Sequence, residues 1–67
     1  MAASAEMYKW YAGSTLLATT NSIDEMILCM AASQYPRPNS EKMKNDLKDG
    51  TVFSYAVGAF TVKKTND

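Results

Sequence analysis

Residues 21–32, which read NSIDEMILCMAA, decide how the chain folds because they contain its clearest helix signal. Ser22 can accept a hydrogen bond at the start of a helix while Glu25, three residues later, returns one, which is the pattern of a capping box. Apolar residues then recur at the three- and four-residue spacing of one helical face. We therefore predict a helix over residues 22–34.

The predicted helix is apolar around most of its circumference. Leu28, Cys29 and Ala32 widen the face that the periodic positions define, so we expect this helix to be buried on more than one side. Cys29 also lies among apolar neighbours without a positive charge nearby in sequence. We interpret it as a small core residue and not as a reactive thiol.

An aromatic segment and a turn precede this helix. Residues 7–11 read MYKWY, which is typical of a β-strand. Gly13 and Ser14 suit a two-residue hairpin turn, because glycine adopts the positive φ that the first turn position requires. A hairpin closed by these two residues has the following arrangement: Trp10 opposite Leu17, Tyr8 opposite Thr19, and Tyr11 with Leu16 on the other face.

A second, polar helix follows two prolines that end the first one. Asn39 or Ser40 can cap this helix, which we expect to run to about Lys48. Its apolar residues are Met43 and Leu47, and the others are polar or charged. We therefore expect it to lie on the surface and to touch the core along a narrow seam.

Residues 51–64 form the second β segment, for which two arrangements compete. One is a single bent strand, and the other is a hairpin turning at Gly58 and Ala59. The hairpin places all the large side chains on one face, and a single buried face fixes the register of a sheet. We therefore favour the hairpin, which has these pairs: Val57 with Phe60, and Tyr55 with Val62.

Together these segments predict a small two-layer α+β domain. Its antiparallel sheet consists of two hairpins in the order ββααββ and packs against the apolar first helix, while the polar second helix is peripheral. We expect one domain over residues 1–67, with residues 1–5 and 65–67 as frayed tails.

The composition argues against most catalytic and metal chemistry. The 67 residues have no net charge, no His and one Cys, so neither a disulfide within the chain nor a zinc site is expected. The paired carboxylates Asp24-Glu25 and Asp46-Asp49 are explained by helix capping and by a solvated helix face. We expect no enzyme activity, no cofactor and no metal.

The same features indicate a cytoplasmic protein. The longest apolar run, residues 26–32, is far shorter than the roughly 20 residues of a membrane span, and the N-terminus lacks signal-peptide features. An unpaired thiol fits a reducing compartment. Small chains of this kind include phage and mobile-element inhibitors of host proteins, for which the location would be the host cytoplasm. No residue of the chain identifies such a source.

Our leading hypothesis is a non-enzymatic protein-binding module, an inhibitor or regulator that occupies the surface of a partner protein. A second copy of the chain is one form of such a partner, and addition of a strand to a sheet edge is one route of binding. The candidate contacts are residue types enriched in interface cores, on the second sheet face and in the proline-bounded loop: Met7, Tyr11, Leu16, Tyr35 and Arg37.

The alternative hypothesis is a binder of single-stranded nucleic acid. Such proteins stack bases on aromatic side chains that lie among basic residues of a sheet. The candidates are Tyr8, Lys9, Trp10, Phe60, Lys63 and Lys64. We rank this hypothesis second because a small domain needs its aromatic residues for its own core.

Overall fold

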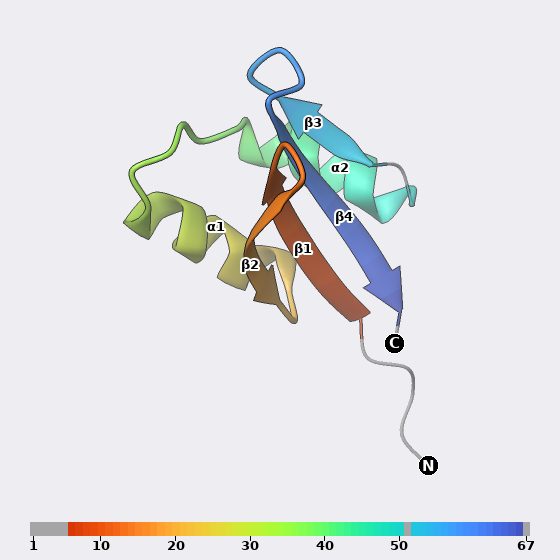
Figure 1. The fold of residues 1–67 in the computed structure, drawn as a ribbon. Helices are drawn as coiled ribbons and strands as arrows, with labels where there is room; N and C mark the ends of the chain where they lie inside the picture. The colour runs from red at the N-terminus through yellow and green to blue at the C-terminus, as the bar shows by residue number, and fades with distance from the viewer. Residues whose placement is uncertain (1–5, 51, 67) are drawn as a thin grey trace.

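The computed structural model describes residues 6–50 and 52–66 (Figure 1). The predicted tail at residues 1–5 and the last residue, Asp67, lie outside the described residues. The elements follow the predicted order: β1 (Glu6–Ala12), β2 (Thr15–Thr20), α1 (Ile23–Ala32), α2 (Ser40–Lys48), β3 (Phe53–Tyr55) and β4 (Phe60–Asn66). The strands form one antiparallel sheet in the order β2-β1-β4-β3, so the hairpins join through β1 and β4.

The helices and the sheet form the two predicted layers. α1 packs against β2 and β1, and α2 packs against β3 near the other edge of the sheet (Figure 1). Apolar side chains from the inner sheet face and from one side of each helix form the core between them: Tyr8, Trp10, Met26, Met30, Met43, Leu47, Phe53, Phe60 and Val62. The α+β prediction is thereby confirmed.

The first hairpin turns at Gly13 as predicted, with a φ of 63° at that residue. The predicted register is wrong, because a β-bulge shifts the pairing after Trp10. Trp10 lies opposite Ala18, and Leu17 is the extra residue, half-buried against the core. A bulge adds one residue to one strand without changing the alternation of the other, so the sequence pattern did not reveal it. The pairs beyond the bulge are Lys9 with Thr19 and Tyr8 with Thr20.

The second β segment is a hairpin and not a bent strand, as we favoured. Its loop is longer than predicted, so Tyr55 pairs with Phe60 and not with Val62. Val57, which we expected on the buried face, is fully exposed in the loop. Ala56 and Val57 both adopt positive φ values, 55° and 57°, a conformation that L-residues rarely enter and that strand alternation does not predict.

The last strand extends further than we expected. The prediction that the tail starts at residue 65 is wrong, because Thr65 and Asn66 continue β4 and lie opposite Met7 and Glu6. β4 therefore pairs with β1 along the whole length of that strand. These two strands form the centre of the sheet.

The first helix begins at the predicted cap. The Ser22 hydroxyl accepts a hydrogen bond from the Glu25 N–H (3.1 Å), and the Glu25 carboxylate accepts one from the Asn21 N–H (3.3 Å). The expectation that α1 is buried on several sides is wrong. Leu28 is 69% exposed and Cys29 is also exposed, so Cys29 is not a core residue. The sheet covers one side of the helix only.

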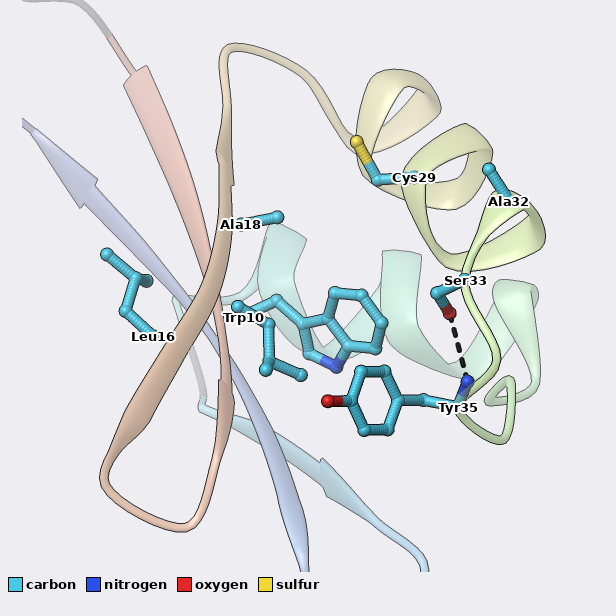
Figure 2. Close-up of a pocket in the computed structure, with 8 residues that line it drawn as sticks. Trp10, Leu16, Ala18, Cys29, Ala32, Ser33 and Tyr35 are labelled. Atoms are coloured by element: carbon cyan, nitrogen blue, oxygen red, sulfur yellow. Dashed lines mark hydrogen bonds between the residues drawn. The ribbon is translucent and has the colours of Figure 1, made fainter.

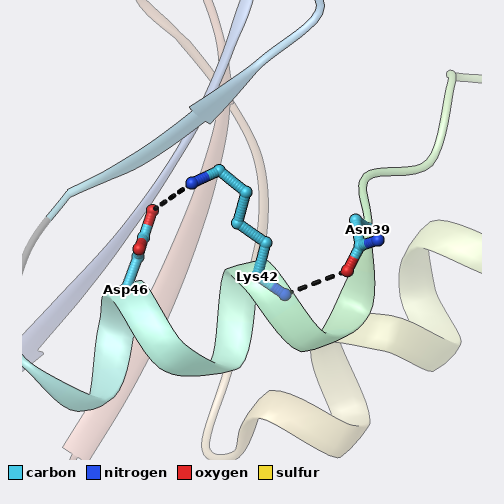
Figure 3. A network of polar contacts seen from close by, with 3 residues as sticks. All are labelled: Asn39, Lys42 and Asp46. Carbon is cyan, nitrogen blue, oxygen red and sulfur yellow. Dashed lines mark hydrogen bonds and ion pairs between the residues drawn. The ribbon is translucent and has the colours of Figure 1, made fainter.

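The second helix matches its prediction closely. Asn39 is the cap, since its side-chain oxygen accepts a hydrogen bond from the Lys42 N–H at 3.0 Å (Figure 3). The Lys42 ammonium lies 3.8 Å from the Asp46 carboxylate, one turn further along. Met43 and Leu47 are completely buried, so this polar helix still contributes two large side chains to the core.

Candidate protein-interaction surface

The sheet face opposite the helices carries no helix among the described residues (Figure 1). Directly opposed residues of an antiparallel pair project to the same face, so the register assigns side chains to it. We call it the uncovered face, and its residues are Met7, Lys9, Tyr11, Leu16, Thr19, Ser54, Thr61, Lys63 and Thr65. All of these residues are exposed or half-buried.

Three of the five predicted partner-binding residues share the uncovered face. Tyr11 lies directly opposite Leu16, which is 49% exposed on the edge strand β2. Met7 lies on the same strand and the same face as Tyr11, and it is half-buried. The structure thus brings apolar and aromatic side chains together on a surface that no described helix covers.

Two lysines interrupt these apolar side chains. Lys9 and Lys63 are directly opposed on β1 and β4, and the Lys63 ammonium lies 5.3 Å from the centre of the Tyr11 ring. Such a cation–π contact orients the ammonium over the ring face. Neither lysine forms an ion pair with a described residue.

The carboxylates of the two helices and their caps do not lie on the uncovered face. Asp24 and Glu25 begin α1, and the others belong to α2 or its C-terminal cap. Lysines on that side do have carboxylate neighbours, since Lys44 lies 3.7 Å from Asp24. The charges of this neutral chain are therefore segregated, and the uncovered face is basic among the side chains that the structure describes.

Tyr35 and Arg37, the other two predicted partner-binding residues, lie on the helix side of the sheet. The Tyr35 ring meets the edge of Trp10 with ring centres 5.8 Å apart and lies 5.7 Å from Phe60. Arg37 is exposed in the same loop. The predicted contact set is therefore divided between two sides of the molecule.

A chain of hydrogen bonds holds this loop in place. The Trp10 indole N–H donates to the Tyr55 hydroxyl at 3.0 Å, and that hydroxyl donates to the Pro36 carbonyl at 3.0 Å. Burial raises the pKa of Tyr55, and the hydrogen bond from Trp10 partly offsets this increase because it stabilises the phenolate. The loop is thus fixed to the core through three residues that are far apart in sequence.

A shallow pocket of about 520 Å³ lies between β2 and α1 (Figure 2). Its lining consists of Trp10, Leu16, Leu17, Ala18, Cys29, Ala32, Ser33 and Tyr35. The Leu16 side chain lies on the other side of β2 from Trp10 (Figure 2). The Ser33 hydroxyl donates to the Met30 carbonyl and accepts from the Tyr35 N–H, so the protein itself already uses this polar group.

The residues of the nucleic-acid hypothesis are divided between the two sheet faces. Tyr8, Trp10 and Phe60 are buried in the core, where their rings cannot stack on a base. Lys9 and Lys63 lie on the uncovered face, whereas Lys64 lies opposite Tyr8 and belongs to the inner face. The aromatic and basic side chains that we combined on sequence grounds do not form one surface.

Sequence reasoning did not select the polar residues of the uncovered face, which are Thr19, Ser54, Thr61 and Thr65. Thr61, Lys63 and Thr65 alternate with inward-facing residues along β4, and this period of two is the signal that could have identified them. The alignment of β4 with β1 has no comparable local signal.

The described residues contain no group of three or more Cys, Asp and Glu side chains placed to hold a metal ion. Neither described helix has the length and apolar character needed to cross a lipid bilayer. Comparisons with known proteins give no match, whether to a protein-family model, to a curated protein or to a solved structure.

Proposed function

We propose that this protein is a non-enzymatic binding module that occupies the surface of a partner protein through its uncovered face. The observation that carries the proposal is the grouping of Met7, Tyr11 and Leu16 on a sheet face without a described helix. Tyrosine and methionine are enriched in interface cores, and two-layer domains usually bury apolar side chains on the covered face. A module that blocks its partner in this way would be an inhibitor or regulator.

The division of the predicted contacts favours the uncovered face over the loop at Tyr35. The Tyr35 ring already packs on Trp10 and Phe60, and Tyr55 holds the adjacent Pro36 carbonyl. These residues have a structural role that explains their positions. Tyr11 and Leu16 contact solvent, and no described helix accounts for their apolar character.

A cytoplasmic location belongs to the same proposal. Cys29 is an exposed, unpaired thiol, and such thiols persist in reducing compartments. A cytoplasmic partner protein follows from this location.

Nucleic-acid binding is the second candidate and has less support. Lys9 and Lys63 could contact phosphates, but the three rings proposed for stacking are buried, and among the described residues of the uncovered face Tyr11 is the one aromatic side chain. Stacking of successive bases requires several accessible rings.

Affinity capture with matched variants tests the proposal. The immobilised chain is incubated with nuclease-treated lysate of its source, and retained proteins are quantified by mass spectrometry. We expect one dominant protein that Tyr11→Ala and Leu16→Asp no longer retain. Leu28→Asp, which changes an exposed residue of α1 on the other side of the sheet, is the control and should retain it. Equal retention by all three variants would contradict the proposal, as would a dominant protein lost only with the control.

A further inference from the structure

We infer that the uncovered face recognises an acidic segment of its partner, whose carboxylates lie between Lys9 and Lys63; this inference rests on the proposed function. Directly opposed residues of an antiparallel pair have Cβ atoms about 4.5–5.5 Å apart, so the side chains of Lys9 and Lys63 are long enough to reach a common point above the sheet. One carboxylate at that point accepts hydrogen bonds from both ammonium groups. Charge-assisted hydrogen bonds of this kind are the strong ones at protein interfaces.

In the free protein, the opposition of the two lysines has an energetic cost. Like charges directly opposed across two strands destabilise a sheet, and Lys9 and Lys63 occupy the two central strands. No described side chain of the uncovered face supplies a negative charge. A carboxylate of a bound partner would remove this repulsion, so the placement of the two lysines favours an anionic partner.

The neighbours of the lysines specify the partner further. The Tyr11 ring lies beneath the Lys63 ammonium, and Leu16 continues the apolar surface to the sheet edge. A matching segment therefore carries Asp or Glu beside an apolar residue that packs on Tyr11 and Leu16. Hydroxyl groups of Thr19 and Thr61 lie on the same rungs of the sheet and can donate to further oxygens.

The same geometry favours an acidic protein segment over a nucleic acid as the ligand of the uncovered face. Phosphate recognition commonly uses many cations, with about 6–10 phosphate contacts in typical DNA-binding proteins. The uncovered face offers two lysines, one aromatic ring and the apolar side chains of Met7 and Leu16. A surface with two positive charges beside apolar side chains favours a peptide that presents both carboxylates and apolar groups.

The experiment selects peptides from a random displayed library on the full chain and measures the binding of the enriched peptides by calorimetry. The test variant carries Lys9→Glu and Lys63→Glu. The control carries Lys42→Glu and Lys48→Glu, which change the net charge by the same amount on exposed positions of α2. Circular dichroism first establishes that both variants are folded.

We expect Asp and Glu to be enriched in the selected peptides relative to the library. Their affinity should fall about tenfold or more in the test variant, should change little in the control, and should decrease between about 50 and 200 mM salt. Neutral or basic selected peptides would overturn the inference, as would an equal loss of affinity in both variants. Tighter binding of oligothymidylate than of any selected peptide would also overturn it, in favour of the nucleic-acid alternative.

A further variant, Tyr11→Ala, distinguishes the two proposals. If neutral peptides are selected and Tyr11→Ala abolishes their binding, the uncovered face is a binding surface and only its acidic preference is wrong. If neither Tyr11→Ala nor the double lysine variant affects any selected peptide, the proposed function fails as well.

Discussion

Lys9 and Lys63 lie directly opposite each other on the two central strands of the sheet, and neither has an ion-pair partner among the described residues. Opposed like charges lower the stability of a sheet, and opposite charges at such positions contribute about 0.2–1 kcal/mol. The substitution Lys9→Glu should therefore raise the free energy of unfolding by up to about 1 kcal/mol at low salt. Urea denaturation at low and high salt measures this gain, which should shrink as salt screens the charges.

The same substitution should weaken the binding of an acidic peptide, so stability and binding would change in opposite directions. Such opposition is typical of residues retained for function. Thr19→Glu provides the comparison, because Thr19 lies opposite Lys9 on the other neighbouring strand and leaves both lysines in place. A loss of stability in Lys9→Glu would show that the two ammonium groups do not repel each other in the folded protein.

The sequence predicted the elements that depend on local signals and failed where long-range pairing decides. The caps of both helices, Ser22 for α1 and Asn39 for α2, could be predicted because a cap is a contact between residues three positions apart. The opposition of Lys9 and Lys63 requires the alignment of β1 with β4, which are separated by most of the chain. The apolar part of the candidate site, Met7, Tyr11 and Leu16, could therefore be predicted from the first hairpin, whereas the opposition of its two lysines could not.

The errors about burial have a related physical cause. An apolar helix sequence does not state which of its sides a sheet will cover, so Leu28 and Cys29 were expected in the core and are exposed. Leu17 illustrates the same limit in a strand, because it is the extra residue between the partners of Trp10 and Tyr11. Alternation of apolar and polar residues does not predict such a bulge.

Tyr55→Phe should destabilise the protein by about 1–3 kcal/mol, because it removes two hydrogen bonds, one of them to the partly buried indole of Trp10. The Trp10 indole N–H would lose its acceptor and the Pro36 carbonyl would lose its donor. Chemical denaturation measures the loss, and Tyr11→Phe, at the exposed face, serves as the control with little expected change. A difference below about 0.5 kcal/mol would mean that water replaces both hydrogen bonds.

The stability of the protein should fall at alkaline pH because of Tyr55. Burial raises the pKa of this phenol in the folded state, so above about pH 10 the unfolded chain ionises first and is favoured. The contribution of the Tyr55 phenol to stability is complete below its pKa in the unfolded chain. It is lost as the pH rises through its pKa in the folded protein. In thermal denaturation from pH 9 upward, the wild-type protein should therefore lose its advantage in melting temperature over Tyr55→Phe above about pH 10. An increase of this difference in melting temperature with pH would contradict a raised pKa of Tyr55 in the folded protein.

Val57→Asn should stabilise the protein by about 1 kcal/mol. Val57 has a φ of 57°, where a β-branched side chain is strained, and its side chain is fully exposed, so no packing is lost. Asparagine tolerates this conformation. Val52→Asn is the control, because Val52 is half exposed and has no positive φ. Equal effects of the two substitutions would show that the gain comes from polarity and not from the backbone.

Leu47→Ala should destabilise the protein by about 2–5 kcal/mol, although α2 is the polar and peripheral helix. Leu47 is completely buried beside β3, and its loss leaves a cavity between the helix and the sheet. Lys44→Ala on the exposed side of the same helix removes a surface ion pair with Asp24, which is worth at most about 1 kcal/mol. Urea denaturation of both variants compares the two sides of α2. If both changed stability equally, α2 would be held by its surface charges. A large loss for Leu47→Ala alone would show that the burial of this side chain attaches the helix to the core.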